Sequence, residues 1–150
     1  GIRDVAVTGV QTCALPIFYG DGGNVRDWLH VLDHCRGVDL IMHAGQNGEV
    51  YNIGGGNEVK NIDLTHSILS LCGKGKELIK PVADRKGHDR RYSLSTKKLE
   101  AMGWAPQVPF EQGLKDTVAW YQANEWWWRP IKERDANYKA YMDAQYGKRG

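Results

Sequence analysis

The sequence predicts an α/β fold, more narrowly an α+β part of a domain in which a few short strands alternate with helices. Two kinds of pattern support this prediction. β-Favouring runs occupy residues 25–31, 50–53 and 79–83, and apolar residues recur at helical spacing over residues 64–71 and 110–121. With 150 residues and 41% hydrophobic content, the chain has enough apolar material for one core.

A glycine-rich turn precedes the first strand, and a helix follows it. Residues 19–24, Tyr-Gly-Asp-Gly-Gly-Asn, are turn-forming and lead into the run 25–31. Asp33 is placed to cap a helix that ends at Gly45. The residues that recur at helical spacing within it are Cys35, Val38, Ile41 and Met42.

The next strand, residues 50–53, leads into a turn at residues 54–57. Asn61 precedes a helix that Gly73 ends, so Asn61 is expected to be its cap. The residues that share one face of this helix are Leu64, Ile68 and Leu71.

The second half of the chain begins with a strand at residues 79–83 and a charged loop from Asp84 to Arg91. Ser95 is placed to cap a short helix that ends at Gly103. A longer helix follows Pro109, and its apolar face consists of Phe110, Leu114, Val118 and Tyr121. A last segment of looser helical spacing contains Ile131, Tyr138, Met142 and Tyr146.

Charge and cysteine content disfavour several functions. The net charge of +2 is small and evenly spread, which argues against nucleic acid or a membrane surface as a partner. No apolar run reaches the roughly 20 residues that a membrane span needs. Cys13, Cys35 and Cys72 lie far apart without a CxxC pair, so we expect reduced thiols and a cytoplasmic location.

The first residues are interpreted as a leader foreign to the protein. Residues 7–17 follow neither a helical nor a strand period, and they resemble the conceptual translation of a sequencing adapter. A segment of that origin is excluded from fold reasoning. We therefore expect residues 1–18 to be a non-native leader that contributes nothing to the fold, with the protein's own sequence beginning near Tyr19.

No complete catalytic or cofactor motif is present. The glycine clusters at residues 20–23 and 54–56 lack the G-x-G-x-x-G spacing of a dinucleotide site. No tyrosine lies four residues before a lysine, the spacing at which an ammonium group activates a phenol on the same helix face. His34, His43 and His66 have no partners at metal-ligand spacing. The chain is therefore predicted to contain no catalytic residue, no cofactor-binding residue and no metal ligand.

Two groups of basic residues are candidates for binding an anion. In the loop 84–91, three arginines and a histidine surround a glycine, and planar, permanently charged guanidinium groups suit a diphosphate. A solvated charged loop is the alternative. Arg26 lies in a β-favouring run beside Trp28. It either pairs with a carboxylate such as Asp27 or binds an anion, and the sequence leaves both open.

Three consecutive tryptophans, Trp126–Trp128, lie in the last third of the chain. Successive helical residues turn by about 100°, so at least one of these rings is expected to be exposed or covered by another element. Packing of a C-terminal helix is favoured over a stacking platform for bases.

Together, these residues make the segment from Tyr19 to about Lys132 resemble the C-terminal half of the dTDP-glucose 4,6-dehydratases, extended short-chain dehydrogenase/reductase enzymes of nucleotide-sugar metabolism. The motifs that carry the resemblance are Tyr-Gly-Asp-Gly with Asn-Val-Arg-Asp-Trp at 19–28, Val-Tyr-Asn-Ile-Gly-Gly at 50–55, Asn-Ile at 61–62, Asp-Arg-Lys-Gly-His-Asp-Arg-Arg-Tyr at 84–92, and Trp-Tyr with Asn-Glu-Trp-Trp-Trp at 120–128. The combination of the His-Asp-Arg-Arg-Tyr loop with the tryptophan run favours the dehydratase over related enzymes.

The resemblance implies that residues 19–132 form a nucleotide-sugar-binding region and residues 133–150 a C-terminal helical tail. It implies that Arg26 and Arg85 face the phosphates of a nucleotide diphosphate sugar. The full set of residues that would grip this substrate is Arg26, Asn61, Asp84, Arg85, Lys86, Gly87 and His88. Lys86 departs from the family, in which proline is more usual at this position.

The resemblance also implies NAD as cofactor, bound by an N-terminal Rossmann-type domain that this chain is expected to lack, and a homodimer for the full-length enzyme. The family oxidises the sugar at C4, eliminates water across C5 and C6 and returns the hydride to C6. Its Tyr-Lys pair and acidic dehydration residues lie upstream of the counterpart of Tyr19. Two alternatives are a fragment of a UDP-sugar decarboxylase or epimerase, and a stand-alone nucleotide-sugar-binding module with the tryptophan run as an interface.

Overall fold

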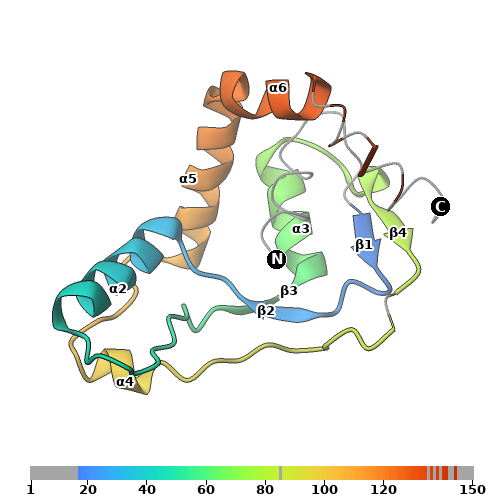
Figure 1. Cartoon of the computed structure of the whole chain (residues 1–150). Coiled ribbons are helices and arrows are strands. Elements are labelled where there is room, and N and C mark those ends of the chain that lie inside the picture. Colours follow the sequence, from blue (N-terminus) through green and yellow to red (C-terminus); the bar gives the residue numbers. More distant parts are fainter. Residues whose placement is uncertain are drawn as a thin grey trace.

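The computed structural model describes residues 17–84 and 86–134, and residues 136, 138, 140, 141 and 144 beyond them. Short strands alternate with helices, which confirms the predicted α/β class (Figure 1). The strands are β1 (Ile17–Tyr19), β2 (Val25–Asp27), β3 (Glu58–Lys60) and β4 (Lys80–Val82). The helices are α2 (Val31–Ala44), α3 (Asn61–Leu71), α4 (Lys97–Glu100), α5 (Phe110–Ala123) and α6 (Glu125–Arg134), with a 3₁₀ turn at Lys76–Leu78.

Two small sheets lie on either side of the 19–24 turn. β1 pairs in parallel with β4, with Tyr19 opposite Val82, and β2 pairs antiparallel with β3, with Arg26 opposite Val59. A parallel bridge between Val25 and Arg91 adds the segment after the charged loop to the free edge of β2. Segments far apart in the sequence therefore meet around β2.

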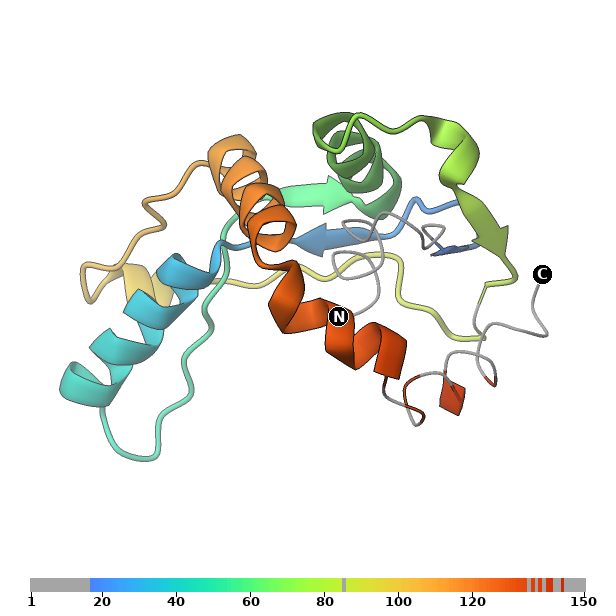
Figure 2. The ribbon, with the colours of Figure 1, turned by 90° about the horizontal axis from the view of Figure 1, so that it is seen from above.

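The core lies between α3 and α5, which stand side by side in Figures 1 and 2. Leu64, Ile68 and Val118 are buried and contact one another, as the helical spacing predicts. Burial of an aliphatic side chain of this size stabilises the fold by about 1.5–3 kcal/mol. Leu71 remains 40% exposed at the end of α3. Gly73 follows with φ +64°, the left-handed conformation that ends a helix and that glycine adopts without strain.

The first strand is shorter than predicted, and Asp33 is not the helix cap. β2 ends at Asp27, and His30 caps α2 by accepting a hydrogen bond from the backbone N–H of Leu32. Asp33 lies inside the first turn, where its fully buried carboxylate accepts backbone hydrogen bonds from Gln107 (2.8 Å) and Val108 (2.9 Å). The prediction was wrong because these partners are more than 70 residues distant along the chain, where sequence spacing gives no signal.

The pKa of Asp33 reflects these contacts. Burial acts to raise the pKa of this carboxyl, but the two backbone N–H groups and the Arg36 guanidinium outweigh burial, and the net shift is downward. The indole Nε1 of Trp104 donates to the Asp33 carbonyl at 3.2 Å. Asp33 thereby attaches the inner face of α2 to the segment that precedes α5.

The apolar residues of α2 do not all face the core. Gly37 is buried on the inner face, where an added Cβ would lie 3.0 Å from Ile53 and 3.2 Å from Trp104. Val31, Val38 and Met42 are 64%, 38% and 77% exposed, and Cys35 is exposed as well. Because these four residues recur at helical spacing, they form a continuous outer stripe on α2.

The predicted strand at residues 50–53 is not observed, and β3 forms at Glu58–Lys60 instead. Within the described residues no strand pairs with residues 50–53, and a strand forms only where its backbone groups find such a neighbour. Side chains bind the segment: Lys98 Nζ donates to the Val50 carbonyl at 3.1 Å, and Asn52 donates to the Ser95 carbonyl at 3.2 Å.

Two further predictions concern helix ends. Thr96, not Ser95, is the N-cap residue of α4, and Lys60, not Asn61, is that of α3. Each cap is shifted by one residue, because the position at which the chain leaves the extended conformation is set by contacts beyond local propensity.

The structure also bears on both ends of the chain. Ile17 and Phe18, the last two residues of the expected leader, pair with Lys80 and Pro81 of β4, so the expectation that the leader contributes nothing to the fold is wrong for these two residues. The partner strand lies more than 60 residues away along the chain, and residues 1–16 lie outside the described residues. Trp126 and Trp127 are 72% and 46% exposed, and Trp128 is 5% exposed and donates to the Tyr121 carbonyl. The expectation that the three rings cannot all be buried is confirmed.

The last segment of looser helical spacing is described only in part. Met142 and Tyr146 of this segment lie outside the described residues.

Candidate site for an anionic ligand

The 19–24 turn connects three parts of the molecule. Gly20 donates its backbone N–H to the Val82 carbonyl at the end of β4 (2.9 Å). The carbonyl oxygens of Gly22 and Asn24 accept from the first backbone N–H groups of α3, those of Ile62 and Asn61, at 2.9 Å each. The turn therefore fixes the N-terminus of α3 relative to β4.

The end of the charged loop and Tyr92, which follows it, are attached to the same turn and to the start of β2. Val25 donates its N–H to the Arg90 carbonyl (2.8 Å), and the Tyr92 N–H donates to the Val25 carbonyl (3.2 Å). The buried Asn24 side chain, 2% exposed, donates to the Asp89 carbonyl at 3.1 Å. Residues separated by about 65 positions in the sequence thus share one hydrogen-bonded network.

Arg26 lies at the centre of this network. Its Nη1 donates to the Val25 carbonyl (2.7 Å), and its Nη2 donates to the Asp89 carbonyl (3.1 Å) and lies 3.2 Å from Nε2 of His88. Its Cζ lies 4.1 Å from the centre of the Tyr92 ring. Asp27 instead accepts the N–H of Asn57. Among the described residues no carboxylate forms an ion pair with Arg26, which favours the anion-binding alternative over pairing with Asp27.

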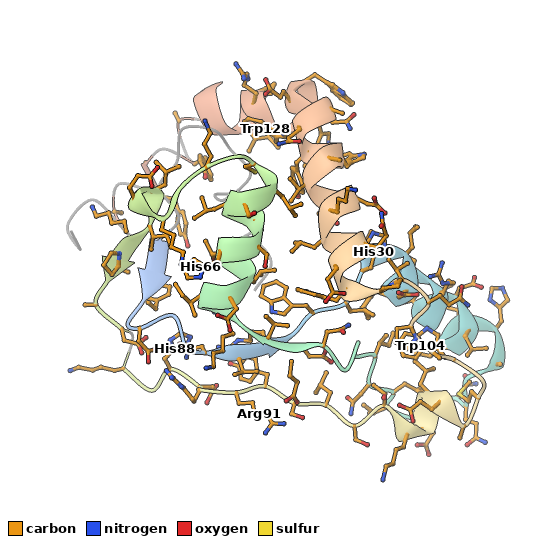
Figure 3. All side chains as sticks on the ribbon, turned by 180° about the vertical axis from the view of Figure 1, so that it is seen from behind. His30, His66, His88, Arg91, Trp104 and Trp128 are labelled. Atoms are coloured by element: carbon orange, nitrogen blue, oxygen red, sulfur yellow. The ribbon has the colours of Figure 1, made fainter. Side chains whose placement is uncertain are left out.

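His88 connects Arg26 to the start of the loop. Its Nδ1 lies 2.7 Å from Oδ1 of Asp84, and its side chain is 7% exposed. A carboxylate only accepts, so Nδ1 carries the proton and Nε2 accepts from Arg26. The Tyr19 ring meets the imidazole edge-on at 5.8 Å between centroids. In Figure 3, His88 lies apart from His30 and His66, so these histidines do not gather at one site.

The remaining predicted residues of the loop lie beside this chain of contacts. Lys86 is exposed, and Gly87 has φ +69°, which permits the tight reversal at the tip of the loop. Arg85 lies outside the described residues. The structure thus brings Arg26, Asp84 and His88 together.

Asn61 has an unsatisfied acceptor. Its Oδ1 is buried and receives no hydrogen bond within the described part of the chain. An orphaned buried acceptor costs free energy, and a ligand is one way to satisfy it. Asn61 is joined to the same turn through its backbone N–H, which donates to the Asn24 carbonyl two residues before Arg26.

Two arginines of the loop have a different role from the one that the sequence suggests. Arg90 binds Asp21 through two parallel contacts, Nη1 to Oδ1 at 2.7 Å and Nη2 to Oδ2 at 3.0 Å, and Arg91 forms an ion pair with Glu58. The hydrogen bonds from Arg90 and from the Gly23 N–H lower the pKa of Asp21 to about 2. Asp21 and Asn24 were missed as partners of the loop because nothing in local spacing signals contacts of such long range.

Neither the N-terminus of α3 nor the two glycine clusters fits the pyrophosphate of a dinucleotide. The first two N–H groups of α3, which could otherwise approach a pyrophosphate, already donate to the turn. Both glycine clusters lead into strands, β2 and β3, and neither opens a helix. Over the described residues no group of three or more His, Cys, Asp or Glu side chains is arranged to bind a metal ion, and no helix is long and apolar enough to cross a membrane.

Several known proteins are similar to this chain in sequence and in fold. A family model described as GDP-mannose 4,6 dehydratase matches residues 5–117, a range that includes part of the expected leader. The dTDP-glucose 4,6-dehydratase of Streptomyces antibioticus is 53% identical over 119 residues, which cover 79% of this chain and 36% of that protein.

Two solved structures show the same relationship. The dTDP-glucose 4,6-dehydratase of Bacillus anthracis, in complex with NAD, is 49% identical with a TM-score of 0.76, over 84% of this chain and 40% of that one. The UDP-glucose 4-epimerase of Thermotoga maritima, with UDP-glucose, is 34% identical with a TM-score of 0.68, over 79% of this chain and 37% of that one. The expected resemblance to the C-terminal part of dTDP-glucose 4,6-dehydratases is confirmed. The chain spans about two fifths of the length of such relatives, and it belongs to the GDP-mannose 4,6 dehydratase family.

Proposed function

We propose that residues 19–132 bind the diphosphate of a nucleotide sugar, as part of an enzyme that converts dTDP-glucose to its 4-keto-6-deoxy product. The observation that most supports this proposal is the state of Arg26. Four contacts fix its guanidinium group, yet none of them is with a carboxylate among the described residues. A positioned and unneutralised guanidinium group is suited to an anionic ligand.

Arg26 retains donors for such a ligand. An arginine has five N–H donors, and the described contacts use one on Nη1 and both on Nη2. One on Nη1 and the one on Nε remain. A phosphate oxygen also competes well with the neutral acceptors of Nη2, because it adds the attraction between opposite charges to the hydrogen bond.

Asn61 and the loop complete the proposed site. The buried Oδ1 of Asn61 is an acceptor for a hydroxyl or N–H group of the same ligand. His88 contacts Arg26, and Asp84 contacts His88. Lys86, Gly87 and Arg85 are assigned to the ligand on the resemblance alone. The C-terminal tail, residues 133–150, has no role in this proposal.

The chain's contribution is binding, without chemistry of its own. Removing a hydride from C4 of the sugar needs a nicotinamide, and the described residues do not fit NAD. Proton transfer at the sugar hydroxyl needs an activated acid–base group, and no Tyr-x-x-x-Lys pair is present. We propose that NAD and these groups belong to the part of the enzyme that the relatives have outside the matched region, and that the full enzyme is a homodimer.

An activity assay tests this division of labour. Purified chain mixed with dTDP-glucose and NAD is expected to form no 4-keto sugar, and calorimetry is expected to detect no NAD binding. Turnover, or binding of NAD in the micromolar range, would show that catalytic and cofactor groups are present in the chain.

Dehydratase is favoured over epimerase by the comparisons. Relatives named dTDP-glucose 4,6-dehydratase are 41–56% identical to the chain, against 34% for the Thermotoga maritima epimerase. The epimerase retains a similar fold, and the diphosphate is common to both substrates. The choice of base and sugar therefore rests on identity, whereas the diphosphate-binding proposal rests on the geometry around Arg26.

Replacement of Arg26 tests the diphosphate proposal. Loss of a charge-assisted contact costs about 1.5–3 kcal/mol, so Arg26→Ala is expected to raise the dissociation constant for thymidine diphosphate roughly tenfold or more. The measurement is isothermal titration calorimetry at low salt. Arg129→Ala is the matched control, because Arg129 is an exposed arginine on α6 that pairs with Glu125. Equal effects of the two variants would contradict the proposal.

A further inference from the structure

The Asp21–Arg90 pair joins the two segments of the chain that carry the proposed site. Arg90 belongs to the same loop as His88, and Asp21 belongs to the turn that precedes Arg26. The two side chains meet through two parallel hydrogen bonds, at 2.7 and 3.0 Å. This geometry, in which both carboxylate oxygens accept from one guanidinium group, is the most specific that an ion pair adopts.

The turn is shaped to receive both ends of the loop. A Cβ on Gly23 would lie 2.3 Å from Nη2 of Arg90, so the guanidinium group occupies the space that a side chain there would need. A Cβ on Gly20 would lie 3.0 Å from Oδ2 of Asp84, at the other end of the loop. Glycine at both positions lets the loop lie directly against the turn.

The Asp21 carboxylate is held by the turn itself as well as by Arg90. Its Oδ1 also accepts the backbone N–H of Gly23 at 2.8 Å, which holds the carboxylate in one orientation. The hydrogen bond from Arg90, and then that from the Gly23 N–H, lower the pKa of this carboxyl to about 2, so it is ionised in the pair at neutral pH. Little side-chain entropy is therefore lost when Arg90 binds.

The position of the loop determines the contacts of Arg26. Its Nη2 contacts the Asp89 carbonyl and Nε2 of His88, and these two residues directly precede Arg90 in the chain. A shift of Arg90 would move both. Arg90 itself is neutralised by Asp21, whereas Arg26 has no carboxylate partner among the described residues.

We propose that Asp21 and Arg90 are positioning residues for the diphosphate site: they hold Asp89 and His88 against Arg26 and do not contact the ligand. This inference rests on the proposed function. By this inference, Arg90 positions the loop beside the site and does not bind the phosphates.

Neutralising Asp21 distinguishes this role from direct phosphate binding by Arg90. If the pair positions the loop, Asp21→Asn and Arg90→Ala each raise the dissociation constant for thymidine diphosphate, by roughly two- to fivefold for an exposed pair. Arg90→Lys, which keeps the charge without the two-pronged geometry, is expected to lie between wild type and Arg90→Ala. If Arg90 binds phosphate directly, Asp21→Asn removes a competitor and lowers the dissociation constant. Tighter or unchanged binding by Asp21→Asn therefore overturns the inference.

Hydrogen exchange in the absence of ligand tests the same inference when binding is not measurable. The N–H groups of Val25 and Tyr92 bond across the junction, and their exchange is expected to quicken by roughly two- to fivefold in Asp21→Asn. The control is Glu125→Gln, which breaks an exposed ion pair on α6 and should leave both rates unchanged. Unchanged rates in Asp21→Asn would overturn the positioning role, while absent ligand binding with the expected rates would count against the proposed function alone.

Discussion

The junction between the 19–24 turn and the 84–92 segment differs from the outer face of α2 in how its groups are satisfied. At the junction, backbone and side-chain groups from distant parts of the sequence bond directly to one another. On α2, the outer stripe of Val31, Cys35, Val38 and Met42 is exposed, and nothing among the described residues covers it. The two faces of α2 themselves differ, because the inner face is fixed through Asp33.

The groups at the junction are satisfied by contacts within the chain, whereas the outer stripe of α2 has no such contacts among the described residues. The proposed anion site is built from contacts internal to the chain, so its geometry is expected to persist in the isolated chain. The outer stripe of α2 removes little apolar area from water, and burial is the source of hydrophobic stabilisation. Substitutions should therefore have large effects on the inner face, intermediate effects at the junction, and small effects on the outer stripe.

The largest effect is expected at Asp33. Asp33→Asn removes the charge and one acceptor from a buried site with two backbone N–H donors, at a cost of about 1–3 kcal/mol. The measurement is the free energy of unfolding from urea titration at pH 7. A loss below that range would show that the inner face of α2 is held by apolar packing instead.

The same residue predicts a pH dependence. The pKa of Asp33 is lower in the folded state than the unfolded value of about 3.9, so its contribution to stability is complete above that value. The contribution is lost as pH falls through the lower, folded pKa. The free energy of unfolding, measured between pH 6 and pH 2.5, should fall less steeply in Asp33→Asn than in the wild type as the pH is lowered. Parallel curves for the two proteins would contradict this assignment.

An intermediate effect is expected at the junction. Asn24→Ala removes the buried donor to the Asp89 carbonyl, at a cost of about 1–1.5 kcal/mol in unfolding free energy. Because Asp89 also accepts from Arg26, the variant should weaken thymidine diphosphate binding as well. Lost stability with unchanged affinity would show that the network does not extend from Asn24 to the site.

The smallest effect is expected on the outer stripe. Met42 is 77% exposed, so Met42→Glu should change the unfolding free energy of this chain by no more than about 0.5 kcal/mol. Thermal unfolding followed by circular dichroism is sufficient to test it. A loss comparable to that of Asp33→Asn would show that the stripe is buried in solution.

The sequence predicts the parts of the fold that depend on local pattern. The faces of α3 and α5 and the end of α3 at Gly73 follow from helical spacing and from glycine. The strand at residues 50–53 could not be settled in this way, because strand pairing requires a neighbour elsewhere in the chain. The helical spacing of Cys35, Val38, Ile41 and Met42 predicts the α2 helix. It does not predict which face of the helix is buried, because Val38 and Met42 are exposed in the structure.

The candidate site was predictable only in part. Arg26 stood out because a charge beside Trp28 in a β-favouring run is unusual, and the loop stood out by its composition. The partners that orient them, Asp21 and Asn24, lie within an ordinary turn sequence. Their roles depend on contacts across more than 60 residues, which a single sequence does not encode in any local spacing.

We propose that a diphosphate binds beside Arg26 and His88, next to the 19–24 turn to which Asn61 is hydrogen-bonded. The most direct measurement is the change in backbone amide chemical shifts of ¹⁵N-labelled chain on titration with thymidine diphosphate at low salt. We expect saturable shifts at residues 24–27, 61–62 and 86–91, with α2 and α6 unaffected. Shifts confined to α2 or α6, or none at millimolar ligand, would contradict it.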